Sequence, residues 1–266
     1  MYSSLWLYRR FIIVSAWADL RHRFSGSLAG YLWNILLPLV QIAVFAVIFS
    51  VLLAYRSPVQ GDGKFGFVVF LCAGLLPWNS FAETVVRASG GFVGNAGFLK
   101  KLPIPEQVFI AKEVCVGFFS FAFAVSVFLV FMLLTGTHPS LAWIQIVPLT
   151  LLLLGFAYGI GMCLACLNVF YRDIQPLTNV LMLLWMWVTP VVYPETAFSG
   201  SQHSWMYTVF RLNPAYHFIA GFREALHAGT WITGQRWMVC LGIAVVANLV
   251  AWPLLRTLRS EIRDTL

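Results

Sequence analysis

The chain has 266 residues, of which 60% are hydrophobic and only 10% are charged. A soluble domain has about one quarter charged residues, so this composition excludes a soluble protein, whose surface it could not cover. The net charge is +7. Because the basic residues are spread around apolar segments rather than clustered in one patch, they indicate membrane topology and not nucleic-acid binding.

Residues 1–24 are too charged to cross a membrane and instead predict an amphipathic helix. Its apolar stripe consists of Trp6, Ile13, Trp17, Leu20 and Phe24. Arg9, Arg10 and Arg21 flank the stripe, whereas Asp19, His22 and Arg23 face away from it. This pattern is typical of a helix in the lipid headgroup plane. The helix is either a simple anchor on anionic lipid or a site where Arg10, Arg21 and Arg23 also bind substrate phosphate.

The run RRFIIVSAWA within this helix mimics a signal peptide. Its apolar core is too short, because Asp19 follows soon after. We therefore expect these residues to remain in the mature protein.

Uncharged segments predict six membrane spans, because a span needs about 20 apolar residues. The expected spans are 30–54, 65–82, two within 114–171, 174–194 and 237–255. The two spans within 114–171 are expected to form a helical hairpin that turns at Thr135–Ser140, which supplies Gly, Pro and polar residues. No repeat, linker or soluble region interrupts the pattern, so residues 1–266 are expected to form one all-α integral membrane domain.

An even number of spans puts both termini on one side, and the basic residues predict that this side is the cytoplasm. In this orientation 12 lysines and arginines lie inside and 5 lie outside. Cytoplasmic segments of membrane proteins carry such an excess of positive charge.

Residues 87–112 form the longest expected cytoplasmic loop, with a glycine-rich first half and the run FLKKLPIPEQ after it. Pro103 and Pro105 forbid a continuous helix. A short amphipathic helix followed by a stiff kink is therefore expected, a shape suited to transmitting force to a partner; an ordinary positive loop is the alternative. The residues assigned to this contact are Phe98, Leu99, Lys100, Lys101, Leu102, Pro103 and Pro105.

Residues 195–235 contain two short apolar helices broken at Asn213-Pro214. They are long enough to enter the membrane from outside and return, provided that they pack in protein or line a water-filled cavity. We expect an outer gate of re-entrant helices, with a surface-lying helical hairpin as the alternative. The gate residues are Tyr207, Phe210, Asn213, Pro214 and Tyr216.

Two expected spans have a face of amides and aromatic rings, groups that suit the hydroxyls and C–H faces of sugars. The channel-lining candidates are Asn34, Gln41, Phe45 and Phe49 in the first span and Asn179, Met186 and Tyr193 in the fifth. For any single one of these residues, ordinary helix packing is the favoured explanation. The near absence of charge argues against an ion pathway.

No catalytic or metal-binding motif is present in the sequence, and no phosphate-binding G-x-x-x-x-G-K-[ST] loop. Cys163 and Cys166 form a C-x-x-C without a third ligand nearby, so we interpret them as buried apolar residues. The chain is thus expected to be neither an enzyme nor a metalloprotein. Active transport would require a separate subunit that binds the nucleotide.

Six segments together resemble a known family. They are RFSGSLAGYLWNILLPLVQ, GLLPWNSFAETV, FLKKLPIPEQV, NVFYRDIQPL, WVTPVVYP and LNPAYHFIAGFREAL. Over almost the whole chain this order is similar to the ABC-2 type permeases that export polysaccharides, including O-antigen, capsule and teichoic acid.

The resemblance implies a homodimer in the bacterial inner membrane with two cytoplasmic ATPase subunits, which bind ATP and Mg²⁺. Residues 97–107 then correspond to a coupling helix seated on the ATPase. The first and fifth spans line a channel between the two copies, and residues 195–235 gate its outer end. The implied substrate is a glycan on an undecaprenyl-type pyrophosphate lipid, with O-antigen as the first choice.

Two other classes remain alternatives. A drug or small-lipid ABC-2 exporter usually lacks the basic interfacial helix and the aromatic path. A membrane-bound enzyme or a secondary transporter would need clustered intramembrane acids or histidines. An adjacent ATPase gene among glycosyltransferase genes would separate these classes.

Overall fold

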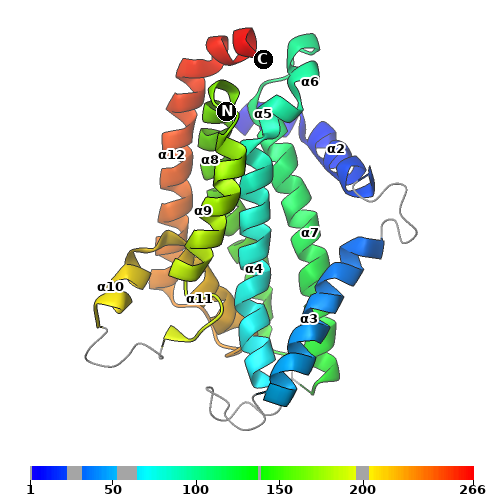
Figure 1. Ribbon diagram of the computed structural model, residues 1–266, viewed down its shortest axis with the longest axis vertical. Helices are drawn as coiled ribbons and strands as arrows, with labels where there is room; N and C mark the ends of the chain where they lie inside the picture. The colour runs from blue at the N-terminus through cyan, green and yellow to red at the C-terminus, as the bar shows by residue number, and fades with distance from the viewer. Residues whose placement is uncertain (1, 23–31, 53–64, 137–138, 196–203) are drawn as a thin grey trace.

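The computed structural model describes residues 2–22, 32–52, 65–136, 139–195 and 204–266. Throughout these residues the regular structure is helical, which agrees with the expected all-α class. The helices, labelled as in Figure 1, are α1 (Tyr2–Leu7), α2 (Arg9–His22), α3 (Trp33–Leu52), α4 (Gly66–Ser89), α5 (Gly91–Gly94), α6 (Ala96–Lys101), α7 (Gln107–Leu134), η2 (Leu141–Gln145), α8 (Ile146–Phe170), α9 (Ile174–Val188), α10 (Ser204–Leu212), α11 (Pro214–Leu226) and α12 (Gly234–Thr265).

Four of the described helical segments are long and apolar enough to cross a membrane: α4, α7, the continuous segment Leu141–Phe170 and α12. Two more, Ile35–Ile48 within α3 and the whole of α9, are apolar but shorter. In chain order these six correspond to the six segments expected from the sequence. The protein is therefore a multi-pass membrane protein.

Several helix boundaries differ from those expected, because uncharged windows do not mark where a helix ends. α4 continues past residue 82 to Ser89, and α12 continues past residue 255 to Thr265, so both contain charged residues in their last turns. α9 ends at Val188, two residues before Pro190. A helix can keep its own backbone hydrogen bonds beyond the apolar region, whereas proline removes a donor.

The expected hairpin between the third and fourth spans is present. α7 ends at Leu134 and η2 begins at Leu141, so the turn lies at the predicted place. Gly136 has a φ of 87°, which a residue with a side chain rarely adopts. Ser140 begins η2 as its N-cap and accepts a hydrogen bond from the Ala142 amide.

α4 is the central helix of the bundle and packs against α7, α8, α9 and α11. Aromatic side chains fill the space between these helices. The Phe81 and Phe156 rings are stacked 5.3 Å apart, and Phe156 stacks on Phe218 at 5.7 Å. Trp185 on α9 meets Phe81 edge-on at 5.6 Å. Offset and edge-on ring pairs of this kind stabilise a core beyond the area that they bury.

α8 approaches its neighbours closely at two glycines. A Cβ at Gly159 would lie 2.7 Å from the Ala247 backbone carbon on α12, and one at Gly161 would lie 2.4 Å from the Ala88 Cβ on α4. Small residues allow membrane helices to pack backbone to backbone. Asn248 on α12 adds a hydrogen bond to the Gly155 carbonyl at 2.8 Å.

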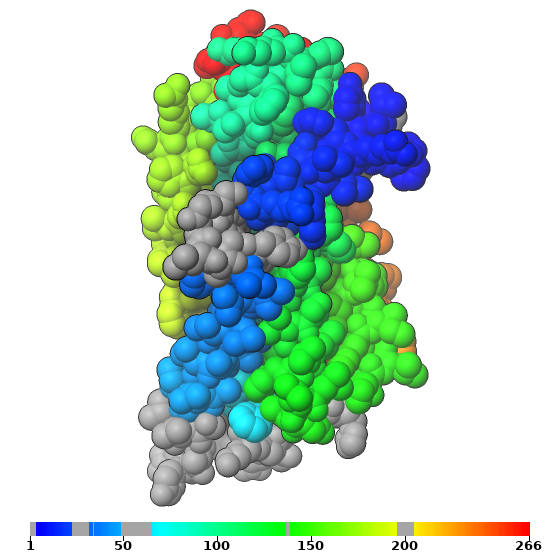
Figure 2. Space-filling model, turned by 90° about the vertical axis from the view of Figure 1, so that its right-hand side faces the viewer, coloured from blue at the N-terminus to red at the C-terminus, as the bar shows by residue number. Residues whose placement is uncertain are grey.

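The N-terminal helices, α5, α6 and the C-terminus lie at one end of the bundle, named here the α6 end (Figure 1). Both chain ends therefore lie at the same end, as an even number of spans requires. α10 and α11 lie in the opposite half. Figure 2 shows α1 and α2 across the side of the molecule just below α6, with α3 and α7 beneath them.

Candidate functional site

The segment 97–105 forms an exposed tip at the α6 end. Phe98 is 56% exposed and Leu102 is 39% exposed, whereas Leu99 is buried and attaches the tip to the bundle. Lys100 and Lys101 are also exposed. An apolar side chain and two cations thus face away from the bundle together, which is the composition of a contact surface rather than of a buried turn.

The tip has the shape that its prolines predict. α6 ends at Lys101, and Leu102 has extended backbone with φ −114° and ψ 140°. Pro103 is exposed and Pro105 is half-buried, and α7 begins only at Gln107. The residues from 87 to 89 and from 107 to 112, expected in the loop, instead belong to α4 and α7.

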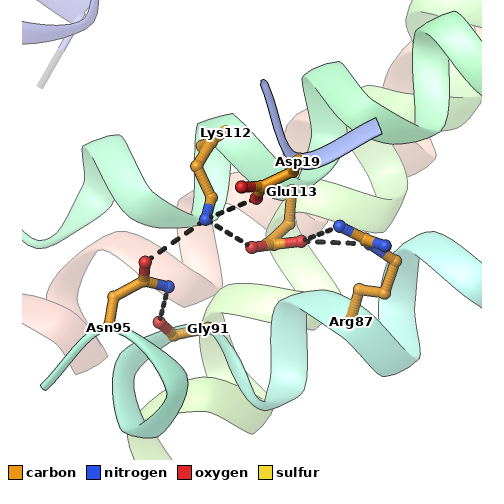
Figure 3. Close-up of polar contacts among 6 residues, drawn as sticks. All are labelled: Asp19, Arg87, Gly91, Asn95, Lys112 and Glu113. Atoms are coloured by element: carbon orange, nitrogen blue, oxygen red, sulfur yellow. Dashed lines mark hydrogen bonds and ion pairs between the residues drawn. The ribbon is translucent and has the colours of Figure 1, made fainter. Parts of the chain in front are cut away.

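A buried lysine fixes the base of this tip. Lys112, 7% exposed on α7, lies 2.8 Å from an Asp19 carboxylate oxygen on α2. The same Nζ lies 3.1 Å from Glu113 Oε1 and donates to Asn95 Oδ1 at 3.2 Å. Figure 3 shows the lysine between these three partners. Three acceptors satisfy the three donors of one ammonium group.

Arg87 and Asn95 extend this group of contacts, which we call the Lys112 junction (Asp19, Arg87, Asn95, Lys112 and Glu113). Arg87 on α4 donates to Glu113 Oε2 from Nε at 3.0 Å and from Nη2 at 2.8 Å. Asn95 Nδ2 donates to the Gly91 carbonyl at 2.7 Å (Figure 3). The junction therefore connects α2, α4, α7 and the residue just before α6.

α2 packs on the bundle with a face that overlaps the predicted apolar stripe only in part. The buried residues are Ile12, Ala16 and Leu20, whereas Trp6 is 71% exposed and Ile13 is 50% exposed. Of the stripe, Leu20 belongs to the packed face and the Trp17 ring meets the Phe119 ring edge-on at 5.4 Å, whereas Trp6 and Ile13 remain exposed. The Asp19 carboxylate, expected to face away from the stripe, points toward Lys112 on α7.

The three arginines expected near substrate phosphate are placed only in part. Arg10 and Arg21 are exposed on α2, and Arg23 lies outside the described residues. Arg9 stacks 4.4 Å above the Trp6 ring and donates to the Trp6 carbonyl at 3.0 Å. A cation held over an aromatic ring is a usual feature of a membrane interface.

Of the candidates on α3, the structure describes two side chains. Gln41 is half-buried and lines a cavity of about 170 Å³ between α3, α4 and α7, with Asn79, Glu83 and Ser120 among its other polar residues. Phe45 packs against the main core. The side chains of Asn34 and Phe49 lie outside the described residues.

The candidates on and after α9 are separated from those on α3. Asn179 is exposed, Met186 packs against the core, and the Tyr193 hydroxyl donates to the Trp187 carbonyl at 2.7 Å. α3 packs on α4 and α7, whereas α9 packs on α4 and α8, so the two helices lie on different sides of α4 (Figure 1). The structure therefore does not bring the two sets together within one chain.

In the opposite half, the helix break occurs where the sequence predicts. α10 ends at Leu212 and α11 begins at Pro214, with Asn213 between them as an N-cap 7% exposed. Asn213 Oδ1 accepts from Trp185 Nε1 at 2.9 Å, and its Nδ2 donates to Thr189 Oγ1 at 2.8 Å. One amide thus joins the break to the end of α9.

Two tyrosines and a phenylalanine surround this break. Phe210 is 3% exposed and lies 6.1 Å from the Tyr193 ring. The Tyr216 hydroxyl donates to Glu195 Oε2 at 2.5 Å. Tyr207 lies beneath the Arg211 guanidinium, 5.5 Å from the ring. Phe210, Asn213 and Tyr216 are therefore neighbours of the chain that follows α9.

Arg223 on α11 is a partner of α9 that the sequence reasoning missed. Its Nη1 donates to the Pro190 carbonyl at 2.7 Å and its Nη2 to the Val191 carbonyl at 2.6 Å. The guanidinium stacks 3.8 Å from the centre of the Phe70 ring on α4. Because α9 has already ended, these carbonyls have no helical partner and the arginine satisfies them.

Comparison with known proteins agrees with this architecture. The family model described as ABC-2 type transporter matches residues 10–227. The chain belongs to the ABC-2 type transporter family. The matched residues include nearly all of α2, the tip at α6, the Lys112 junction and the α10–α11 break, whereas α12 lies beyond them.

The relatives of this ABC-2 chain include named permeases. It is 28% identical over 222 residues to the O-antigen export system permease protein RfbA of Klebsiella pneumoniae, covering 82% of this chain and 81% of that protein. A protein of the same name from Myxococcus xanthus is 26% identical over 264 residues, covering 99% and 98%. The polysialic acid transport protein KpsM of Escherichia coli is 24% identical over 212 residues, covering 79% of each.

The Lys112 junction was missed because the sequence does not show which distant residues pair. One signal was present: Lys112 and Glu113 lie inside an otherwise apolar helix, and buried charges in such a helix require partners. The described residues contain no group of three His, Cys, Asp or Glu side chains placed to hold a metal ion.

Proposed function

We propose that this chain is the transmembrane permease subunit of an ATP-driven exporter that moves O-antigen polysaccharide across the bacterial inner membrane. The observation that carries the proposal is its similarity to proteins named O-antigen export system permease, one of them over 99% of this chain. The sequence contains no nucleotide-binding loop, which supports the proposal that ATP and Mg²⁺ bind to a partner subunit.

In this proposal the six apolar helices cross the membrane, and both termini and the α6 end lie in the cytoplasm. The excess of basic residues in the segments at that end supports the orientation. The apolar parts of α3 and α9 are short for a helix that crosses the bilayer. A locally thinned bilayer or neighbouring protein would accommodate them.

The exposed tip at residues 97–105 is proposed as the coupling element that binds the ATPase. Phe98 and Leu102 supply apolar contact area, and Lys100 and Lys101 supply charge for steering and register. Leu99, Pro103 and Pro105 hold the tip in shape. The Lys112 junction then relates any displacement of the tip to α2, α4 and α7.

The working unit is proposed to be two permease chains with two ATPases. The two sets of channel candidates lie on different sides of α4, so a channel that both sets line requires a second copy. Exposed apolar residues on α9 give such a copy a surface: Leu177, Val180, Leu181, Leu183, Leu184 and Trp187. Gln41, Phe45, Asn179 and Met186 would then face the path, together with Asn34, Phe49 and Tyr193.

The substrate is proposed to be a glycan on an undecaprenyl-type pyrophosphate lipid. Arg10 and Arg21 are exposed on the interfacial helix, and Arg23 follows them in sequence. Guanidinium groups bind phosphate oxygens with two parallel donors, so these residues suit the pyrophosphate at the cytoplasmic leaflet.

α10 and α11 are proposed to be the re-entrant outer gate. Tyr207, Phe210, Asn213, Pro214 and Tyr216 lie at the break between the two helices. Asn213 provides side-chain partners for backbone and side-chain groups at this break, which non-helical chain at membrane depth requires.

Export of a capsular polysaccharide is the second candidate function, because KpsM, a polysialic acid transport protein, is also a relative. Its identity to this chain is 24%, against 26–28% for the O-antigen permeases. O-antigen is therefore the first choice.

Deletion of the gene tests the function and separates the two candidates. We expect O-antigen to disappear from the cell surface, with lipid-linked glycan accumulating in the inner membrane, and a plasmid copy to restore export. Loss of capsule alone would select the second candidate. Unchanged amounts of both surface glycans would contradict polysaccharide export.

A further inference from the structure

The last turns of α12 extend beyond any bilayer and reach the tip at α6. At 1.5 Å per residue the 32 residues from Gly234 to Thr265 form a helix about 48 Å long, whereas the hydrocarbon core is about 30 Å thick. Figure 1 shows the C-terminus beside α5 and α6. These residues also lie outside the part that the family model matches, which ends at residue 227.

A buried carboxylate receives this end of α12. Glu106 directly follows Pro105, precedes α7 and is 0% exposed. Arg263 Nε donates to Glu106 Oε1 at 2.6 Å. Arg259 Nε lies 3.1 Å from Glu106 Oε2, an ion pair by distance without the alignment of a hydrogen bond. A fully buried carboxylate needs such cations, because its desolvation is otherwise uncompensated.

The same two arginines also bind the residues on either side of this glutamate. Arg263 Nη2 donates to the Ile104 carbonyl at 3.4 Å, and Arg259 Nη2 donates to Gln107 Oε1 at 3.0 Å. Gln107 Nε2 in turn donates to Ser4 Oγ on α1 at 2.8 Å. The kink that ends the tip is therefore attached to α12 and, through Gln107, to the N-terminal helix.

The tip is thus fixed at both ends by buried polar groups. Lys112 holds Asn95, the residue before α6. Arg259 and Arg263 hold Glu106, the residue after Pro105. The positive-inside rule explains the presence of basic residues at the end of α12, but it does not require any of them to pair with a particular carboxylate. Arg256 illustrates the difference: it is exposed, and within the described part of the chain it forms no ion pair.

We propose that Arg259 and Arg263 are positioning residues that make the cytoplasmic end of α12 move together with the coupling tip. This inference rests on the proposed function, because it assigns a role in ATPase-driven motion. Displacement of the tip by the ATPase is passed through Glu106 to α12 as well as through the Lys112 junction to α2, α4 and α7. The side chains of Arg259 and Arg263 are 42% and 44% exposed, so they can be replaced without opening a cavity in the core.

The test compares Arg259→Gln with Arg263→Gln in one chain against the control Arg256→Gln. Complexes with the ATPase are purified and reconstituted in liposomes, where bound ATPase per permease and ATP turnover are measured. Glycan export is measured in cells and compared with the ATP turnover of the same variant. The double variant is expected to keep its ATPase but to export at least about tenfold less glycan per ATP, a change of ~1.4 kcal/mol in coupling. Arg256→Gln is expected to behave as the wild type.

Glu106→Gln is expected to reproduce the double variant, because it removes the charge that both arginines bind. If the double variant fails to assemble, Arg263→Lys decides the question, since it keeps the charge but cannot bind Glu106 and Ile104 at once. Reduced export per ATP in that variant supports the proposal. The proposal is overturned if the double variant assembles and exports a normal amount of glycan per ATP. Where only Arg263→Lys assembles, normal export per ATP in that variant overturns it. A wild-type chain that binds no ATPase would instead refute the proposed function.

Discussion

The two halves of the bundle are both held by polar side chains, and their main contacts differ, although Arg236 and Glu224 also form an ion pair between α12 and α11 in the half opposite α6. At the α6 end, carboxylates and cations from separate helices pair with one another, as at Lys112 and Glu106. In the opposite half, Asn213 and Arg223 bind partners around the end of α9, including backbone carbonyls. At the α6 end the side-chain pairs join separate segments, whereas in the opposite half contacts with freed carbonyls stabilise the chain where α9 ends.

This difference predicts that variants in the two halves fail in different ways. Changes at the α6 end should alter how ATP hydrolysis is linked to export. Changes near Asn213 and Arg223 should alter the outer end while the ATPase still binds. The predictions below follow this division, from the largest expected effect to the smallest.

The largest effect on stability is expected for Lys112→Met. This change removes the cation that the Asp19 and Glu113 carboxylates share. Breaking a buried ion pair by removing one partner costs about 3–5 kcal/mol. Denaturation of the purified permease in detergent measures the free energy of unfolding. The control Lys100→Met, at an exposed position, should change it by less than about 0.5 kcal/mol. Equal stability of the two variants would show that the junction does not hold the helices together.

Arg223→Met is expected to have the next largest effect, because it leaves the Pro190 and Val191 carbonyls without donors. A hydrogen bond to a charged group contributes about 1.5–3 kcal/mol to stability. Binding of the ATPase should remain normal, since the change is far from α6. Arg211→Met is the control: it removes an exposed cation above Tyr207 and should cost less than about 1 kcal/mol. Loss of ATPase binding in Arg223→Met would contradict the prediction that changes in this half leave ATPase binding intact.

The smallest effect on stability is expected for Gln41→Leu, at the cavity between α3, α4 and α7. Stability should change little, but glycan export or substrate-stimulated ATP turnover should fall about threefold to tenfold if the amide faces the path, a loss of ~0.6–1.4 kcal/mol. Val40→Leu, an exposed neighbour on the same helix, is the control. Normal export and turnover in Gln41→Leu would assign this residue to helix packing.

The helices and their order could be predicted from the sequence, because the bilayer requires apolar segments of nearly fixed length. The hairpin at Thr135–Ser140 and the break at Asn213-Pro214 were also correct, since glycine and proline act locally on the backbone. The ends of α4 and α12 were not, because a helix continues past its last apolar turn wherever its charges reach water or a partner.

The charged contacts of the site could not be predicted, because each depends on which distant segments pack together. Asp19 and Lys112 are far apart in sequence, and the helical wheel of α2 does not show which of its residues pack on α7. Arg259 and Arg263 were counted only for topology, although Glu106 makes both specific. All of the sequence-based site assignments remain predictions, and the side chains of Arg23, Asn34 and Phe49 lie outside the described residues.

The central claim is that the tip at residues 97–105 binds a separate ATPase. Lys100→Glu combined with Lys101→Glu tests it most directly, with Arg256→Glu as a single charge-reversal control at the same end. The ATPase encoded with the permease should co-purify with the wild type and the control. Its amount should fall at least about tenfold with the double variant, equivalent to ~1.4 kcal/mol of binding free energy, while the permease remains folded. Recovery of the ATPase with the double variant at the wild-type amount would contradict the account.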